Sequence, residues 1–310
     1  MRATIIVKIN IGVTLKKIIF IAAIFGLFTG QAFSQLDDRF GSIDENDIIN
    51  FAKPMVTTLG TGLNSGGFHT AKVSKIFGFS IGIIGIKGMM IFIPNDQLTF
   101  TPKLPAGYAS GDPTATIWGD KGGIYSGPYG FVTYPDGFNQ TNIPFGVPQA
   151  TISALGTELL VRFIPTVTVS NNEFNFLGIG VKHSISQWIP LIPVDVAVQV
   201  LYNKLEVNNL ISSTNIAVNA HASKSFGVFT TYGGLQYESS NFKLDYKIKG
   251  DPASGNPLLR TDRDISVDID GDNTFRVVIG GTLNFAFLTI SADYSLGSQS
   301  VFTGGLTFGF

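Results

Sequence analysis

Histidines and serines are the residues of this chain that could perform acid–base or nucleophilic chemistry, because the chain has no cysteine. A histidine can activate a serine hydroxyl as a nucleophile, as lipid-modifying membrane barrels do at their lipid-facing rim. His183 lies close to Ser184 and Ser186 in the sequence. However, no Gly-x-Ser-x-Gly pattern surrounds these serines, and the nearby Trp188 indicates a position at a membrane interface. We therefore predict no catalytic residue and expect that the protein is not an enzyme.

An acidic segment, residues 262–272, could bind a metal ion, because it has an aspartate at several alternate positions. Clustered carboxylate oxygens are the ligands that calcium prefers. The spacing does not match the twelve-residue calcium loop and lacks its closing glutamate. We therefore predict a solvated acidic loop, no metal site and no cofactor.

Charged residues also recur within segments that alternate between apolar and polar side chains. In one such segment Arg162 lies on the face opposite Leu159, Val161 and Phe163. An arginine that faces lipid costs about 2–4 kcal/mol at the bilayer midplane. We therefore use the rule that charged side chains of a strand point into the lumen of the barrel, which places Arg162 there. The same rule puts Lys243 and Asp245 inward, opposite Phe242. The main set of lumen-facing candidates comprises Glu158, Arg162, Lys182, Asp195, His221, Arg276 and Asp293. Such a set either forms an ion-pair network that fills a narrow lumen or lines a path for a solute.

The elements that carry these charges are predicted to be strands of an all-β, transmembrane antiparallel barrel. The C-terminal segment is typical of the closing strand of such a barrel, because apolar residues alternate with small ones and the chain ends on an aromatic residue. The outward residues of this strand, expected to act as the signal for membrane insertion, are Phe302, Leu306, Phe308 and Phe310. The other alternating segments predict about 10–14 strands, because single-chain barrels have even numbers.

The composition agrees with a barrel. Charged residues are 14% of the chain, against about 25% in soluble domains, and the chain has 26 phenylalanines. The net charge of −1 gives no electrostatic case for binding nucleic acid.

The N-terminal part is predicted to contain two segments before the barrel. Residues 1–34 have a basic start, an apolar core and a small-residue cleavage site, which is typical of a secretory signal peptide. Residues 35–62 are predicted to be a helical plug or a periplasmic segment, and residues 63–310 the barrel. The predicted helix begins near Asp44 and has one apolar face; Pro54 leaves open one helix or two halves. The face comprises Ile48, Phe51, Ala52, Met55 and Leu59.

Two long segments are predicted to be irregular. If the last strand descends to the periplasm, residues 249–273 form an extracellular loop. Residues 103–150 are rich in glycine, proline and tyrosine, and the strand count puts them on the wrong side for a simple surface loop. They therefore either hide another strand or fold back toward the lumen.

Three segments, residues 63–72, 156–165 and 178–190, resemble an uncharacterised family of Gram-negative outer-membrane barrels. The chain is more distantly similar to the long-chain fatty-acid transporters, which combine an N-terminal hatch with a barrel of 14 strands. It is shorter than those transporters and lacks the Asn-Pro-Ala signature of their hatch.

The resemblance implies a porin-like, non-enzymatic barrel of the cell outer membrane that assists uptake of small hydrophobic molecules. Its expected partners are outer-membrane lipids, the outer-membrane insertion machinery and a small hydrophobic ligand. A structural or adhesive barrel that acts through its extracellular loops is the alternative, and a lipid-modifying enzyme is the second. An apolar pocket between the helix and residues 103–150 would favour uptake, whereas a hydrogen bond between His183 and a serine would favour the enzyme.

Overall fold

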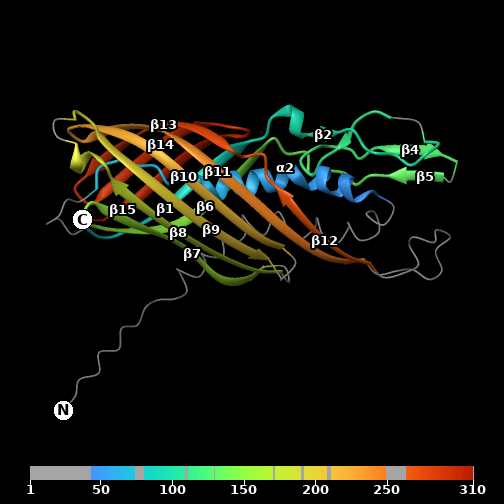
Figure 1. The fold of residues 1–310 in the computed structure, drawn as a ribbon, viewed down its shortest axis with the longest axis horizontal. Helices are drawn as coiled ribbons and strands as arrows, with labels where there is room; N and C mark the ends of the chain where they lie inside the picture. Colours follow the sequence, from blue (N-terminus) through green and yellow to red (C-terminus); the bar gives the residue numbers. More distant parts are fainter. Residues whose placement is uncertain are drawn as a thin grey trace, which may run out of the picture.

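Ten antiparallel strands close into a barrel in this computed structural model (Figure 1). The structure describes residues 43–73, 80–108, 111–128, 130–169, 172–189, 192–207, 211–248 and 263–309; the predicted signal peptide lies outside them. The barrel strands are β1 (Ser80–Phe92), β6 (Asn142–Ala154), β7 (Thr157–Val169), β8 (Asn172–Ser184), β9 (Asp195–Val207), β10 (Ile211–Phe226), β11 (Phe229–Ile248), β13 (Phe275–Phe285), β14 (Leu288–Leu296) and β15 (Ser300–Phe308). Neighbouring strands follow this order, and β15 pairs with β1 to close the ring. The predicted all-β barrel, at the lower end of the expected strand number, is confirmed.

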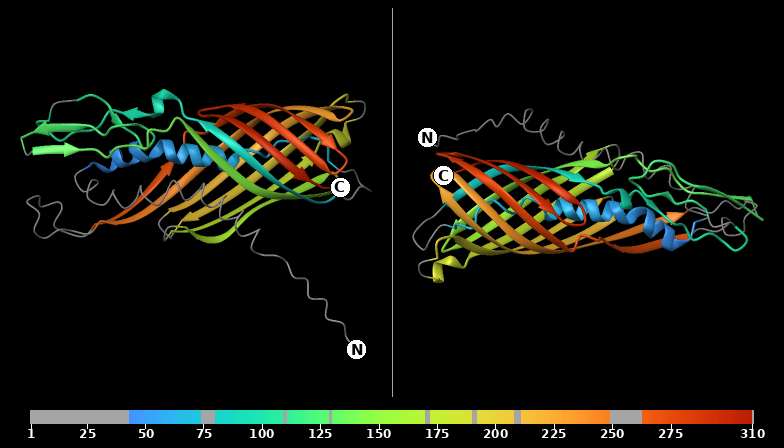
Figure 2. Two further views of the ribbon diagram at one scale, coloured as in Figure 1. Left: turned by 180° about the vertical axis from the view of Figure 1, so that it is seen from behind. Right: turned by 90° about the horizontal axis from the view of Figure 1, so that it is seen from above.

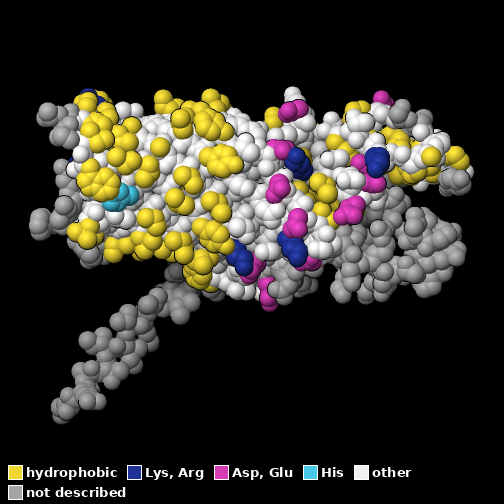
Figure 3. All heavy atoms as spheres, in the orientation of Figure 1, with side chains coloured by type: hydrophobic (Ala, Val, Ile, Leu, Met, Phe, Trp, Pro, Cys, Tyr) yellow, Lys and Arg dark blue, Asp and Glu magenta, His cyan; other side chains and the backbone are white. Residues whose placement is uncertain are grey.

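Apolar side chains cover one part of the outer wall. Along β15 the exposed residues are Phe302, Leu306 and Phe308, as predicted; Phe310 lies outside the described residues. On β11 the exposed apolar stretch runs from Phe229 to Tyr237. Eight residues correspond to about 26 Å along a strand, or about 20 Å of height at a typical tilt of roughly 40°. Figure 3 shows this apolar band over the half of the barrel that holds the C-terminus.

Charged side chains gather beyond the band, at the other end of the molecule (Figure 3). On β11 the prediction for Lys243 and Asp245 was wrong: both are exposed, whereas Phe242 is buried. The charge rule assumes that a strand crosses lipid, but this part of β11 projects past the apolar band. There the outer face meets water, and the apolar residues turn inward.

The predicted loop at residues 249–273 contains a strand, which corrects that expectation. Strand β12 (Arg263–Asp270) pairs with the projecting end of β11, from Asn241 to Ile248, and β13 pairs with the first part of β11, from Phe229 to Tyr237. Residues 249–262 lie outside the described part. The aspartates of β12 therefore alternate along a strand instead of clustering in a loop.

The described residues contain one α-helix, α2 (Glu45–Asn64), which lies inside the barrel (Figure 2). The side chain of Asp44 caps its first turn by accepting a hydrogen bond from the backbone N–H of Asn46, which lowers the pKa of Asp44. Pro54 does not divide the helix, so the two-half alternative is wrong. Packing around the helix compensates for the missing backbone bond: Pro54 is buried, and so is every residue from Gly60 to Asn64. Within the described residues, no helix combines the length and hydropathy needed to cross a bilayer.

Residues 93–141 form an extension at the charged end of the barrel (Figure 2). It contains η2 (Asn95–Gln97) and two small sheets, β2 (Thr99–Phe100) with β3 (Thr114–Ala115) and β4 (Ile124–Gly127) with β5 (Gly130–Thr133). Its backbone at Ile117 donates to the carbonyl of Phe51, and the indole of Trp118 donates to Thr58, so it covers the N-terminal half of α2. The irregular segment therefore hid a strand, β6, and another part of it, around Ile117 and Trp118, packs on the helix. A short η3 (Ser186–Trp188) lies before β9.

Candidate functional site

Two wall arginines hold the C-terminal end of α2. The last turn of this helix has no basic residue of its own, so its carbonyl groups and its negative dipole end need partners. Arg162 of β7 donates to the carbonyl oxygens of Leu63 and Ser65, at 2.7 and 2.8 Å. Arg276 of β13 donates to the carbonyl of Thr61 at 3.2 Å and to the hydroxyl of Ser65. We call α2 together with residues 65–73 the plug.

The plug turns sharply after α2 and then places His69 among charged wall residues. Gly66 has a φ of +74°, in the left-handed region that favours glycine. Beyond it, His69 Nε2 lies 3.4 Å from a carboxylate oxygen of Glu158 and 3.2 Å from Lys182 Nζ. Lys182 in turn lies 2.9 Å from Glu158 and donates to the carbonyl of Thr70. The ion pair is therefore satisfied within the cluster, and it ties β7 and β8 to the plug.

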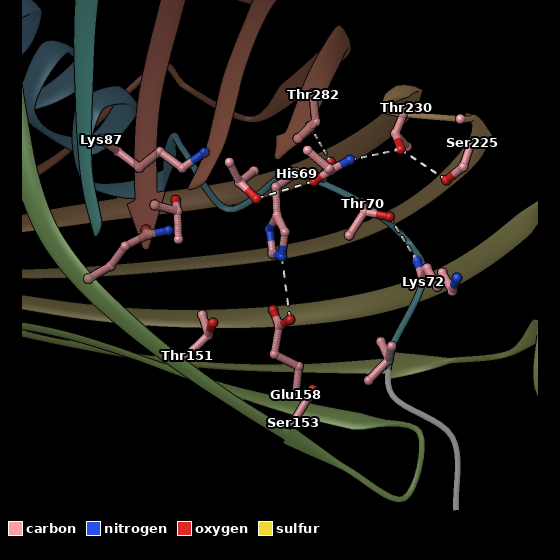
Figure 4. Close-up of a pocket in the computed structure, with 16 residues that line it drawn as sticks. His69, Thr70, Lys72, Lys87, Thr151, Ser153, Glu158, Ser225, Thr230 and Thr282 are labelled. Atoms are coloured by element: carbon pink, nitrogen blue, oxygen red, sulfur yellow. Dashed lines mark hydrogen bonds and ion pairs between the residues drawn. The ribbon is translucent and has the colours of Figure 1, made fainter. Parts of the chain in front are cut away.

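A polar pocket of about 710 Å³ lies between the plug and the barrel wall (Figure 4). The plug contributes its last residues, and the wall contributes hydroxyl and amide side chains from six strands. The pocket is lined by His69, Thr70, Lys72, Val73, Lys87, Gln149, Thr151, Ser153, Glu158, Ser225, Gly227, Thr230, Thr282, Asn284, Thr289 and Thr307. Gly227 and Asn284 are exposed at the short turns between strands, so the pocket opens at the end of the barrel that holds the C-terminus.

Lys87 of β1 is the least compensated charge of this pocket. Its side chain is 1% exposed, and its ammonium donates to Ser291 at 2.7 Å. Of the nearby carboxylates, Glu158 pairs with Lys182, whereas Asp293, which accepts from Tyr232 at 3.0 Å, attracts Lys87 only from beyond ion-pair distance. Among the described residues, Lys87 has no ion pair within 4.0 Å.

The wall itself is interrupted between β6 and β7. These strands pair over six residue positions, from Ala154 opposite Thr157 to Gln149 opposite Arg162. From Gln149 toward its N-terminal end, β6 stays paired with β1 as far as Asn142. From Arg162 toward its C-terminal end, β7 stays paired with β8. No further pair joins the two strands, both of which the structure describes in full. We call this unpaired stretch the seam.

Prolines explain the seam locally. Pro144 and Pro148 lie on β6, and Pro165 lies on β7, so three residues at its edges lack an N–H group for pairing. A register shift follows Pro165, and beyond it Val167 packs on the apolar core. The alternation that places Leu159, Val161 and Phe163 outward also predicts an outward Val167, and this prediction was wrong because the bulge reverses the alternation.

Apolar side chains lie behind the seam. Phe145 and Val147 of β6 and Ile164 of β7 are buried in one cluster with residues of α2. Three contacts orient the helix: Gly60 lies against Ser240, Thr57 Oγ1 accepts from the backbone of Asp272, and Gly62 lies against Phe145. By helical spacing, the predicted apolar face points away from β11 and β12, toward the arc of β6 to β9. Met55 and Leu59 on this face are only partly buried.

The residues predicted to face the lumen occupy different positions. Glu158, Arg162, Lys182 and Arg276 contact the plug directly, as described above. His221 is buried, with its Nδ1 2.9 Å from the amide oxygen of Asn219. Asp293 is buried beside Tyr232, whereas Asp195, the first residue of β9, is half-buried.

Three residues of the site were not among the predicted ones. Lys87, and Glu238, which pairs with Arg276 at 2.8 Å, are single charges in alternating segments, so the rule applied to Arg162 would have found them. His69 carried no such signal, because it lies in neither a strand nor a helix.

The residues proposed for lipid chemistry lie apart from any nucleophilic serine. His183 Nδ1 lies 2.8 Å from the hydroxyl of Thr157, and its Nε2 lies 2.9 Å from the amide of Gln187. Ser184 and Ser186 instead contact each other at 3.1 Å. A Gly-x-Ser-x-Gly sequence does occur at residues 78–82, but its serine begins β1 and not a strand-to-helix turn.

The acidic segment forms no metal cluster in the part of the chain that the structure describes. Asp268 and Asp270 are exposed on β12, and Asp272 pairs with Lys53 at 2.7 Å.

DUF6588, a family of unknown function, matches residues 15–310. The chain belongs to this family. No curated protein matches the chain. The DUF6588 barrel is similar to three solved structures, which differ from it widely in sequence.

The translocator domain of the autotransporter NalP from Neisseria meningitidis is 10% identical, with a TM-score of 0.29, over 87% of this chain and 99% of that one. OmpT, an outer-membrane protein of Vibrio cholerae, is 10% identical, with a TM-score of 0.25, over 74% and 99%. The outer-membrane channel DcaP of Acinetobacter baumannii is 11% identical, with a TM-score of 0.20, over 78% and 100%. None of the three is described as a fatty-acid transporter, so that distant resemblance stays a prediction.

Proposed function

We propose that this DUF6588 member is a non-enzymatic barrel of the outer membrane that assists the passage of small hydrophobic molecules. In this proposal the seam is the entrance from the lipid, and α2 is the hatch behind it. The observation that carries the proposal is the partly buried apolar face of α2, with Met55 and Leu59, on the side of the barrel where β6 and β7 separate.

The apolar band supports a location in a membrane. A closed barrel satisfies its backbone groups internally, so its outer side chains can be apolar at no hydrogen-bonding cost. Aromatic residues are exposed at both ends of the band, as in the girdles of outer-membrane barrels. Those at the short-turn end are Phe226, Phe229, Phe285, Phe287 and Phe308; those toward the extension are Phe92, Phe163, Tyr202, Tyr237 and Phe275.

The depth of the seam supports entry from lipid. On β1, Ile86 is level with Pro148, and Phe92 is level with Asn142. Ile86 and Phe92 are exposed apolar residues of the band. The unpaired stretch of β6 therefore lies at the same height as the lipid-facing wall. An apolar molecule that leaves lipid there meets the apolar side chains of Phe145, Val147 and Ile164.

Because the plug fills the lumen, a path for the molecule through the side wall is favoured over a path along the barrel axis. The arginines and the His69 cluster bind the plug to the wall near the barrel axis, so an open water-filled pore along the axis has little room. The predicted apolar pocket between α2 and residues 103–150 is occupied by side chains of the protein itself, among them Ile117, Trp118 and Phe138. Passage would therefore need a small shift of α2 or of the extension.

A second candidate function is adhesion through the extension. The hairpin of β4 and β5 projects beyond the barrel and exposes Ile124 and Phe131 (Figure 1). Exposed apolar residues at the tip of a loop favour a partner surface. The barrel would then serve as the anchor, and the seam would have no role.

Binding of an apolar probe tests the proposal. The protein in lipid nanodiscs is titrated with a fluorescent straight-chain hydrocarbon probe, and a Met55→Gln, Leu59→Gln double variant is compared with it. We expect the variant to bind about tenfold more weakly, since two apolar side chains become polar. Ile49→Gln, a change at another partly buried position of α2, is the matched control and should alter binding less than about twofold. Equal binding by both variants would favour the adhesive barrel.

A further inference from the structure

We propose that the polar pocket beside the plug binds a small hydroxylated anion, with Lys87 as the counter-ion of its acidic group. This site is separate from the seam, because it lies between the plug and the wall at the end of the barrel that holds the C-terminus. The proposal goes beyond hydrophobic passage and does not depend on it.

The pocket has the size and the lining of a binding site for a hydrophilic molecule. Its volume of about 710 Å³ is within the range of roughly 300–1,000 Å³ that is usual for small-molecule sites. Apart from Val73 and Gly227, all the residues that line it are polar or charged, and eight of them carry hydroxyl groups. Hydroxyls both donate and accept hydrogen bonds, so this lining suits a molecule that is itself rich in hydroxyl groups.

Lys87 supplies the reason for an anion. A buried ammonium is stable only when its charge and its donors are satisfied. Ser291 takes one hydrogen bond of Lys87, while Glu158 and Asp293 bond to other groups. Figure 4 shows the Lys87 ammonium directed toward the space in front of His69. A carboxylate or phosphate in that space would complete its coordination.

The other charges around the pocket also favour a negatively charged ligand. Glu158 is compensated by Lys182 at 2.9 Å and by His69 at 3.4 Å. Lys72 is exposed at the pocket and adds a further positive charge. His69 lines the pocket, and its Nδ1 is buried without a hydrogen-bond partner among the described residues.

The pocket joins the plug to the wall, which gives a ligand a structural effect. His69 and Thr70 belong to the plug, whereas Lys87, Thr151 and Thr307 belong to β1, β6 and β15. A ligand that bonds to both sides would link the plug more firmly to the barrel. The same binding should therefore raise the unfolding temperature of the protein.

Calorimetric titration of the purified full chain tests the proposal. The probes are D-gluconate, a hydroxylated carboxylate; glucose 6-phosphate, a hydroxylated phosphate; and glucose, their neutral counterpart. We expect one of the two anions, or both, to bind and to raise the unfolding temperature, with glucose about tenfold weaker or undetectable. Equal binding of glucose and the anions, or no binding of either anion, would overturn the proposal.

Two variants test whether Lys87 is the positive charge that binds the anion. Lys87→Met keeps the length of the side chain and removes a buried charge, so it should fold, which heat-modifiable gel migration checks. We expect it to weaken anion binding at least about tenfold. Lys72→Met removes an exposed charge at the pocket and should weaken binding less than about threefold. Unchanged affinity in folded Lys87→Met would contradict the assignment. Met55→Gln, Leu59→Gln should bind the anion normally, which separates this site from the seam.

Discussion

Arg276 and Glu238 form an ion pair of 2.8 Å inside the barrel, and each side chain is only 2% exposed. Arg276 comes from β13 and Glu238 from β11, and both lie beside the end of α2. Gln236 also donates to Glu238, at 2.8 Å. The pair is therefore a shared support of the wall and the plug.

Glu238→Gln is expected to destabilise the barrel strongly, because it leaves the arginine charge buried without its partner. Removing one member of a buried pair typically costs about 3–5 kcal/mol. The measurement is urea unfolding in detergent, followed by heat-modifiable migration. Lys121→Met, which breaks the exposed pair with Asp136 at 3.4 Å, is the control and should cost less than about 1 kcal/mol. Similar losses in both variants would contradict the buried support.

Brominated lipids are expected to quench Trp188 but not Trp118. These are the only two tryptophans of the chain; Trp188 is 68% exposed and Trp118 is 2% exposed. Trp188 stands next to the short-turn end of the wall, whereas Trp118 is buried between the extension and α2. The variants Trp118→Phe and Trp188→Phe isolate the two signals in proteoliposomes. Quenching of Trp118 alone would reverse the proposed placement of the band in lipid.

Tyr134 is expected to remain protonated well above the pH at which exposed tyrosines ionise. Burial, together with the hydrogen bond that its hydroxyl donates to Asp47 at 2.6 Å, raises the pKa of Tyr134. Because the folded-state pKa exceeds the unfolded value of about 10, the stabilisation is complete below pH 10 and falls as the pH rises further. Phenolate absorbance should therefore follow the same curve in the wild type and in Tyr134→Phe until the extension detaches. A difference between them near pH 10 would contradict this environment.

The sequence predicted the wall better than the site. Alternation and the cost of charge in lipid were enough to predict an outward Phe302 and an inward Arg162, because each strand obeys these constraints separately. The rule failed at Lys243, where the strand projects past the apolar band. It also missed β6, because Pro144 and Pro148 disturb the strand pattern within a glycine-rich segment.

The polar pocket could not be predicted from one sequence. Lys87 and Ser291 are joined by a hydrogen bond across 204 positions, and His69 lies on a turn of the plug. Their proximity depends on ring closure and on where α2 ends. Neither is encoded in a local pattern.

Access to Leu59 from the lipid tests the proposed function most directly. The chain has no cysteine, so a Leu59→Cys variant has one thiol, and its reaction with a lipid-soluble maleimide can be followed in proteoliposomes. Thr61→Cys is the control, because Thr61 lies on the same helix as Leu59 but is buried beside Arg276 of β13. We predict that the thiol at position 59 reacts at least about tenfold faster than the one at position 61. Equal rates, or no reaction at position 59, would contradict entry through the seam between β6 and β7.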